Sequence, residues 1–253
     1  MKINKIFFSP TGSTKKVADI MCGFLSDNVA ETDLSSSDYD FDSIVFNEED
    51  ICIFAVPSFG GRVPKTAVER IKKLKGNNNR SVLVVTYGNR HYDDTFIELK
   101  DVVMECGFKP FAGVASVCRH SIMTDIAKNR PDKFDIEELR EFSEIIKRHI
   151  DSNNTEVADM PGNRPYRDFG GVPFKPFADE KCISCGKCAK FCPVKAIPLD
   201  NPSETVNDLC ITCMRCVSIC PVSARSLGEG LKIMTEKFAP MLSGRKENRL
   251  FID

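Results

Sequence analysis

The feature that most constrains this chain is a cysteine pattern that occurs twice. Residues 182–193 read CISCGKCAKFCP and residues 210–221 read CITCMRCVSICP, so the pattern C-x2-C-x2-C-x3-C-P recurs with a period of 28 residues. Eight of the twelve cysteines lie in these two copies, and the other four are scattered through the first 150 residues. In an intracellular protein, cysteine at this density indicates metal or redox chemistry rather than a disulfide framework.

The repeated pattern resembles that of the bacterial two-cluster ferredoxins. In that family, three thiolates of one copy hold one 4Fe-4S cluster, and the fourth, next to proline, reaches the other cluster. The resemblance implies a small α+β ferredoxin-like domain over residues 179–228. It also implies two crossed ligand sets, which are Cys182, Cys185, Cys188 with Cys220, and Cys210, Cys213, Cys216 with Cys192.

Two zinc sites are the alternative for this segment, because paired C-x2-C steps also occur in zinc ribbons and thiolates bind either metal. Zinc needs four ligands at each site and no third C-x2-C step, so the full pattern favours iron–sulfur clusters. A domain of this size has little apolar core. We therefore expect the clusters to replace that core and the segment to unfold without them.

The first 150 residues alternate between strand and helix patterns. β-branched and apolar runs predict strands at residues 2–8, 29–34, 50–56, 80–86 and 112–117. Amphipathic stretches predict helices at residues 15–24, 65–75, 95–106 and 135–150. This alternation predicts an α/β fold with a five-stranded parallel sheet, doubly wound, with helices on both faces.

A hydroxyl-rich loop joins the first predicted strand to the first predicted helix. Its backbone N–H groups, its hydroxyls and the positive end of the helix dipole suit a phosphate group. The loop has neither a dinucleotide fingerprint nor a P-loop. The candidate phosphate ligands are Ser9, Thr11, Gly12, Ser13 and Thr14.

Two further loops follow predicted strands, and the carboxyl ends of parallel strands share one edge of a sheet. We therefore expect these loops to share a site with the phosphate loop. Their glycines allow close approach of the backbone to a ligand, and their aromatic residues suit a flat ring. The first contributes Pro57, Ser58, Phe59, Gly60 and Gly61, and the second contributes Tyr87, Gly88, Asn89, Arg90, Tyr92 and Asp93.

The three loops, in this order, resemble those of flavodoxins, whose first loop binds the phosphate of FMN and whose later loops flank the flavin ring. The whole chain resembles the flavodoxin–ferredoxin fusion proteins of anaerobic bacteria and archaea. The resemblance implies FMN and two 4Fe-4S clusters as cofactors. The sequence has no tryptophan to cover the flavin, so Phe59, Tyr87 or Tyr92 would serve. A flavodoxin-like fold that has lost its cofactor is the alternative.

Four segments follow from these patterns. Residues 1–150 form the FMN-binding domain, residues 151–178 a linker rich in proline and glycine, and residues 179–228 the two-cluster domain. Residues 229–253 form a helical tail, because apolar residues recur there at helical spacing. The linker also carries four aromatic residues before the ferredoxin-like segment, so we expect it to pack against protein rather than to hang free.

Charge and hydropathy limit the partners and the location. The net charge is -1, which gives no indication of nucleic-acid binding. Residues 17–61 contain ten acidic side chains and no Lys or Arg, which indicates either a solvated face or a surface for a basic redox partner. No stretch is long enough for a membrane span or a signal peptide. We therefore expect a cytoplasmic protein, with the oligomeric state left open.

These features together predict a protein that relays electrons between two clusters and FMN and converts between one-electron and two-electron steps. No separate nicotinamide-binding domain is visible, so we expect redox proteins, such as a ferredoxin or an oxidoreductase, as partners. The alternative is an oxidoreductase whose clusters feed FMN to reduce oxygen, a quinone or another flavin. The sequence singles out no catalytic residue for that reaction.

Overall fold

The computed structural model, which describes residues 2–253, contains a sheet of five parallel strands with a sixth at one edge. The parallel strands are β1 (Ile3–Phe7), β2 (Val29–Asp33), β3 (Ile51–Pro57), β4 (Arg80–Tyr87) and β5 (Lys109–Val117). Their order is β2-β1-β3-β4-β5, the flavodoxin-like order of a doubly wound sheet. The predicted α/β fold class is confirmed, and each predicted strand is present within a few residues of its expected bounds.

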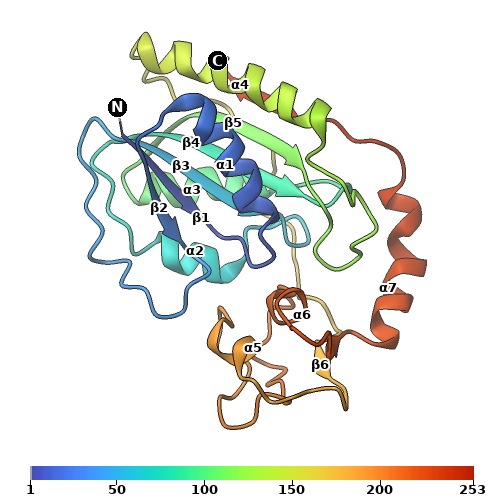
Figure 1. The fold of residues 1–253 in the computed structure, drawn as a ribbon. Helices are drawn as coiled ribbons and strands as arrows, with labels where there is room; N and C mark the ends of the chain where they lie inside the picture. Colours follow the sequence, from blue (N-terminus) through green and yellow to red (C-terminus); the bar gives the residue numbers. More distant parts are fainter. Residues whose placement is uncertain (1) are drawn as a thin grey trace.

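Four helices cover the two faces of this sheet (Figure 1). Helices α1 (Ser13–Leu25) and α4 (Lys133–Asp151) pack on one face, and α2 (Lys65–Ile71) and α3 (Thr95–Glu105) pack on the other. Strand β3 is buried along almost all of its length, and its successive side chains enter the two cores alternately. A strand buried on both faces needs a continuous apolar run, and ICIFAVP provides it.

The C-terminal segment differs from the predicted helical tail. It is helical through α7 (Glu229–Phe238) and the 3-10 helix η1 (Ala239–Leu242), but it ends in the strand β8 (Arg249–Ile252). This strand pairs antiparallel with β5 and forms the sheet edge. The chain leaves the cysteine-rich unit at the carboxyl ends of the strands, so its last residues must run back along the sheet in the opposite direction.

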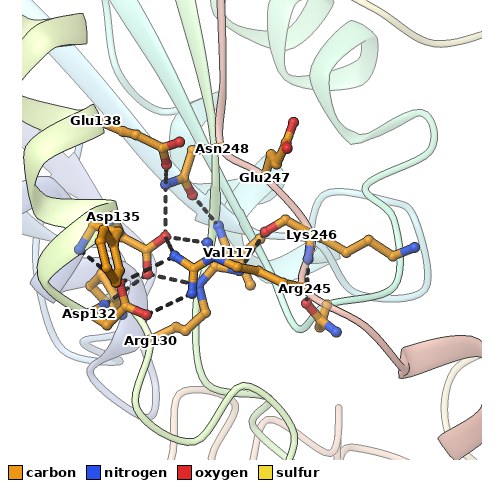
Figure 2. A network of polar contacts seen from close by, with 12 residues as sticks. Val117, Arg130, Asp132, Asp135, Glu138, Arg245, Lys246, Glu247 and Asn248 are labelled. Carbon is orange, nitrogen blue, oxygen red and sulfur yellow. Dashed lines mark hydrogen bonds and ion pairs between the residues drawn. The ribbon is translucent and has the colours of Figure 1, made fainter.

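A buried polar network holds this returning segment (Figure 2). Arg130 donates from Nε to Asp135 at 2.7 Å, and Asn248 donates to the carboxylates of Asp135 and Glu138 at 3.0 and 2.6 Å. The side-chain oxygen of Asn248 accepts from the N–H of Val117 at 2.9 Å. The end of β5, the start of α4 and the C-terminal segment are therefore joined at one point.

The cysteine-rich unit lies below the carboxyl ends of the strands in Figure 1. It contains the short helices α5 (Lys187–Lys190) and α6 (Arg215–Ser218) and a small antiparallel pair, β6 (Phe177–Ala178) with β7 (Arg225–Ser226). The 28-residue repeat is visible in its backbone. Residues with a left-handed backbone conformation (positive φ) occur at matching positions of the two copies. The matching pairs are Ser184 and Thr212, Gly186 and Met214, and Lys195 and Ser223.

The linker lies against the larger unit. Arg164 and Tyr166 both donate to Asp101 on α3, and the N–H groups of Asn163 and Arg167 donate to Asp94 at 2.8 and 2.7 Å. These contacts fasten the linker along one helix.

Within residues 2–253, no helix combines the length and the apolar character needed to cross a membrane.

Candidate functional site

A cavity of about 470 Å³ opens at the carboxyl ends of the parallel strands. The loops after β1, β3 and β4 all contribute to it, so the sheet brings together the three loops that the sequence indicated. The predicted site residues that line it are Ser9, Thr11, Ser13, Thr14, Pro57, Ser58, Phe59, Gly60, Tyr87, Gly88 and Arg90.

The loop after β1 has the geometry of an anion cradle. Ser9 is held on both sides, since its N–H donates to the hydroxyl of Ser35 at 2.8 Å and its own hydroxyl accepts from the N–H of Lys15 at 2.9 Å. Gly12 has φ of 88° and is the N-cap residue of α1, so among the described residues the hydroxyl of Ser9, rather than an N-cap side chain, accepts from an N–H of the first helical turn. Because helix N-termini attract anions, the hydroxyls and free N–H groups of this loop fit a phosphate.

Five predicted site residues do not line the cavity. They are Gly12, Gly61, Asn89, Tyr92 and Asp93. Asn89 instead donates to the carbonyls of Leu242 and Gly244 at 2.6 and 2.8 Å. Tyr92 is only 4% exposed and packs between Tyr87 and Phe96. Tyr92 and Asn89 thus contact the lining residues Tyr87 and Leu242 from outside the cavity, and Tyr92 is not positioned to cover a ring inside it.

Three further segments close the cavity, and none of the candidate cofactor-binding residues lies in them. They are the loop after β5, the linker and α7, which contribute Cys118 to Met123, Phe169, Phe174, Ile233, Met234, Lys237 and Phe238 among others. The ring of Phe169 lies so close to Gly60 that a Cβ atom at Gly60 would be 2.2 Å from it. The linker aromatics were the available signal, since Phe169 and Phe174 belong to that segment and line the cavity.

His120 presents a defined hydrogen-bonding edge at this cavity. Its Nδ1 accepts from the N–H groups of Ile122 and Met123, each at 3.1 Å, so the proton of the neutral ring is on Nε2. Burial lowers the pKa of His120 to about 4. The imidazole therefore stays neutral at physiological pH and acts as a hydrogen-bond donor rather than as a cation.

Two smaller cavities in the cysteine-rich unit are each lined by four cysteines. One, here called the inner cavity, is lined by Cys192, Cys210, Cys213 and Cys216. The other, the outer cavity, is lined by Cys182, Cys185, Cys188 and Cys220. Each set contains three cysteines of one copy and the last cysteine of the other copy, which is the crossed arrangement that the resemblance implies.

The surroundings of these thiols suit metal-bound thiolates. The N–H groups of Ala196 and Ala224 donate to the sulfurs of Cys192 and Cys220 at 3.2 and 3.3 Å, at matching positions of the repeat. Burial raises the pKa of Cys213 to about 12, so its thiolate needs a positively charged ligand. No cysteine among the described residues forms a disulfide, and no group of three or more Cys, His, Asp or Glu there is arranged to hold a single metal ion.

The inner cavity and the main cavity share a wall. Residues 211–213 contribute to the main cavity, and Ile211 and Cys213 also line the inner cavity. The contact is reinforced across the interface, since Arg70 donates to the carbonyl of Pro193 and Lys195 pairs with Asp38 at 2.7 Å. Part of the acidic segment at residues 17–61 is therefore used to dock the chain's own cysteine-rich unit.

Comparison with known proteins finds similarities in each unit separately. Residues 177–226 match the family model described as a 4Fe-4S dicluster domain. No curated protein sequence is significantly similar to the chain. Among solved structures, a flavodoxin of Streptococcus pneumonia TIGR4 is 22% identical over 57% of this chain and 96% of its own length, with a TM-score of 0.40.

Two other solved structures are similar over the same part of the chain. A Fusobacterium nucleatum flavodoxin bound to flavin mononucleotide is 17% identical over 59% of this chain and 99% of its own, with a TM-score of 0.41. The rubredoxin oxygen:oxidoreductase of Desulfovibrio gigas is 17% identical over 60% of this chain and 36% of its own, with a TM-score of 0.46. The chain thus joins a flavodoxin-like α/β fold to a segment that matches the 4Fe-4S dicluster domain family.

Proposed function

We propose that this protein relays electrons between FMN in the main cavity and a 4Fe-4S cluster in each cysteine cavity. A flavodoxin-like fold joined to a 4Fe-4S domain supports an electron-transfer flavoprotein. Bound FMN would exchange two electrons and each cluster one, so the molecule would convert between one-electron and two-electron steps.

The wall shared by the main and inner cavities is the observation that carries this proposal. Cys213 lines both cavities, so a cluster held there would be the neighbour of a flavin on the other side. The outer cavity is more open, because Cys185 is exposed while Cys192, Cys213 and Cys216 are buried. Electrons would therefore pass between a protein partner and the flavin through the outer site first and the inner site second.

The chain's own residues have separate tasks in this scheme. The loop from Ser9 to Thr14 binds the phosphate through N–H groups and hydroxyls. Phe59, Phe169 and Phe174 supply apolar surface that excludes water from a flat ring. The buried cysteines and the apolar side chains beside them keep water from the inner cluster, which helps to set its potential.

The direct test is the cofactor content of protein that is purified without oxygen. We expect eight irons, eight sulfides and one FMN per chain. Cys185→Ser and Cys213→Ser remove one thiolate from the outer and the inner set respectively, and each should lower the iron content without loss of FMN. Either four irons or no flavin in the unaltered protein would contradict the proposal.

Reduction of a small acceptor at the flavin is the second candidate. It is favoured by the apolar side chains that extend the main cavity beneath α7, namely Ile122, Met123, Ile233 and Met234. Anaerobic kinetics separate the two functions. Rapid exchange with a ferredoxin and no turnover with quinones, flavins or oxygen supports the relay, whereas saturable oxidation by one of these acceptors supports the reductase.

A further inference from the structure

The basic side chains of the cysteine-rich unit separate into two groups. Lys181, Lys187, Lys190 and Lys195 are exposed to solvent. The two arginines are not, since Arg225 is 3% exposed and Arg215 is half-buried with its Nε fully enclosed. One arginine lines each cysteine cavity, with Arg215 at the inner one and Arg225 at the outer one.

Arg215 has only neutral partners among the described residues. Its Nη1 donates to the backbone carbonyls of Ser9 and Pro10 at 3.4 and 3.1 Å, and its guanidinium lies 5.8 Å from the ring centroid of Phe191. Its Nε–H has no hydrogen-bond partner. Between residues 2 and 253 it forms no ion pair with any Asp or Glu.

An unpaired guanidinium in this position is costly unless an anion is bound nearby. A buried donor without a partner costs about 1 to 3 kcal/mol, and the enclosed Nε–H of Arg215 is such a donor. Arg215 follows Cys213 by two residues and precedes Cys216, and its backbone N–H donates to the sulfur of Cys213. Arg215 lines the inner cavity and does not line the main cavity, so the anion beside it would be a group held by the thiolates of the inner cavity.

We propose that Arg215 is the charge partner of an iron–sulfur cluster in the inner cavity and raises the reduction potential of that cluster. The inference rests on the proposed function. A 4Fe-4S cluster with four thiolates is an anion, and it gains one further negative charge when it accepts one electron from a reductant. A fixed positive charge beside it stabilises the reduced state more than the oxidised state.

The two carbonyls that hold Arg215 belong to the predicted phosphate loop. The positive charge is thus positioned by the flavodoxin-like unit and not by the cysteine-rich unit alone. The potential of the inner cluster should consequently depend on the docking of the two units, which would match the inner cluster to the flavin that it serves.

The repeat provides a matched control, because Lys187 occupies the position of Arg215 in the first copy and is exposed. We would compare Arg215→Gln, Arg215→Lys and Lys187→Gln by iron and sulfide assay and by dithionite titration followed by electron paramagnetic resonance. Arg215→Gln should lower the potential of one cluster, so that its ratio of reduced to oxidised form at a fixed potential falls about tenfold, equivalent to about 59 mV. Arg215→Lys and Lys187→Gln should shift the reduction potentials of both clusters by less than Arg215→Gln shifts that of the inner cluster.

Each of the other possible outcomes supports or overturns either this inference or the proposed function. Loss of one cluster in Arg215→Gln but not in Arg215→Lys would support the charge role, because lysine keeps the positive charge and glutamine removes it. Equal cluster loss in both variants, or two fully loaded clusters with unchanged potentials in Arg215→Gln, would overturn the inference. Absence of iron from the unaltered protein would instead overturn the proposed function itself.

Discussion

At the scale of single residues, the walls of the main cavity depend on positions where a side chain and a backbone are almost in contact. Gly60 lies under the ring of Phe169, and Gly88 lies under the ring of His120. A Cβ atom at Gly88 would be 2.5 Å from the His120 ring. Glycine at these two loop positions lets segments from three parts of the chain close around one space.

The lowered pKa of His120 predicts that the stability of the protein depends on pH. An unfolded histidine takes up a proton near pH 6.5, whereas folded His120 stays neutral until about pH 4. The unfolded state therefore binds more protons in this window, and the free energy of unfolding falls as the pH is lowered, by at most about 2 kcal/mol at pH 5. Thermal unfolding at pH 7 and pH 5 should show a smaller loss for His120→Gln.

Replacement of Gly60 should weaken both the stability of the protein and its binding of FMN. Its φ of 60° disfavours any side chain, and a Cβ atom would displace Phe169 from the cavity wall. Gly60→Ala should lower the free energy of unfolding by about 1 to 3 kcal/mol and weaken FMN binding, measured by titration of flavin-free protein. Gly23→Ala is the control, because nothing lies within 4 Å of its Cβ position in helix α1. Equal FMN affinity in the two variants would contradict the role of Phe169.

At the scale of secondary-structure elements, the C-terminal segment controls how α7 sits over the cavity. Strand β8 fixes one end of the segment, and the network of Figure 2 fixes the residues just before it. The two hydrogen bonds from Asn89 hold the turn after η1. The helix thus spans the two units and is anchored at its far end on the sheet.

Asn248→Ala tests this anchor. The change leaves the buried N–H of Val117 without its acceptor, which costs about 1 to 3 kcal/mol, and removes both bonds to helix α4. Hydrogen exchange should show faster exchange at Val117, in β8 and in α7, while β1 and β3 stay protected. Glu247→Ala is the matched control, since its side chain points away from the network in Figure 2. Unchanged protection in Asn248→Ala would show that β8 is held by its strand pairing alone.

At the scale of the whole molecule, the two units differ in what stabilises them. The flavodoxin-like unit has two extensive apolar cores, one on each face of the sheet. In the cysteine-rich unit, the apolar cluster is small and consists of Cys188, Ala189, Ile197 and Cys216, with Val217 packed against it. So small a core rarely sustains a fold by itself, and bound clusters would supply the missing stability.

Removal of iron should therefore unfold one unit and spare the other. After treatment with a chelator and an oxidant, limited proteolysis should cut within residues 179–227 and leave a resistant fragment that contains β1 to α4. Flavin binding should persist, though weakened by the loss of the shared wall. A cysteine-rich segment that stays resistant without iron would show that its protein contacts suffice.

The sequence by itself determined the features that arise from neighbours in the chain. The spacing of the cysteines predicts which three thiols of each copy gather at one site, because a tight turn brings residues three positions apart together. The alternation of β and α patterns predicts the parallel sheet, and the strand ends predict which loops meet. Each of these is a local pattern combined with one topological rule.

The tertiary structure alone decided what happens between distant segments. Three contacts of this kind join residues far apart in sequence. They are the wall shared by the main and inner cavities, the hydrogen bonds of Arg215 to Ser9 and Pro10, and the closure of the main cavity by the linker and α7. Strand β8 was missed because four residues at the end of a chain become a strand only when an exposed sheet edge pairs with them. Such contacts depend on how the units pack, and packing leaves no periodic signal in the sequence.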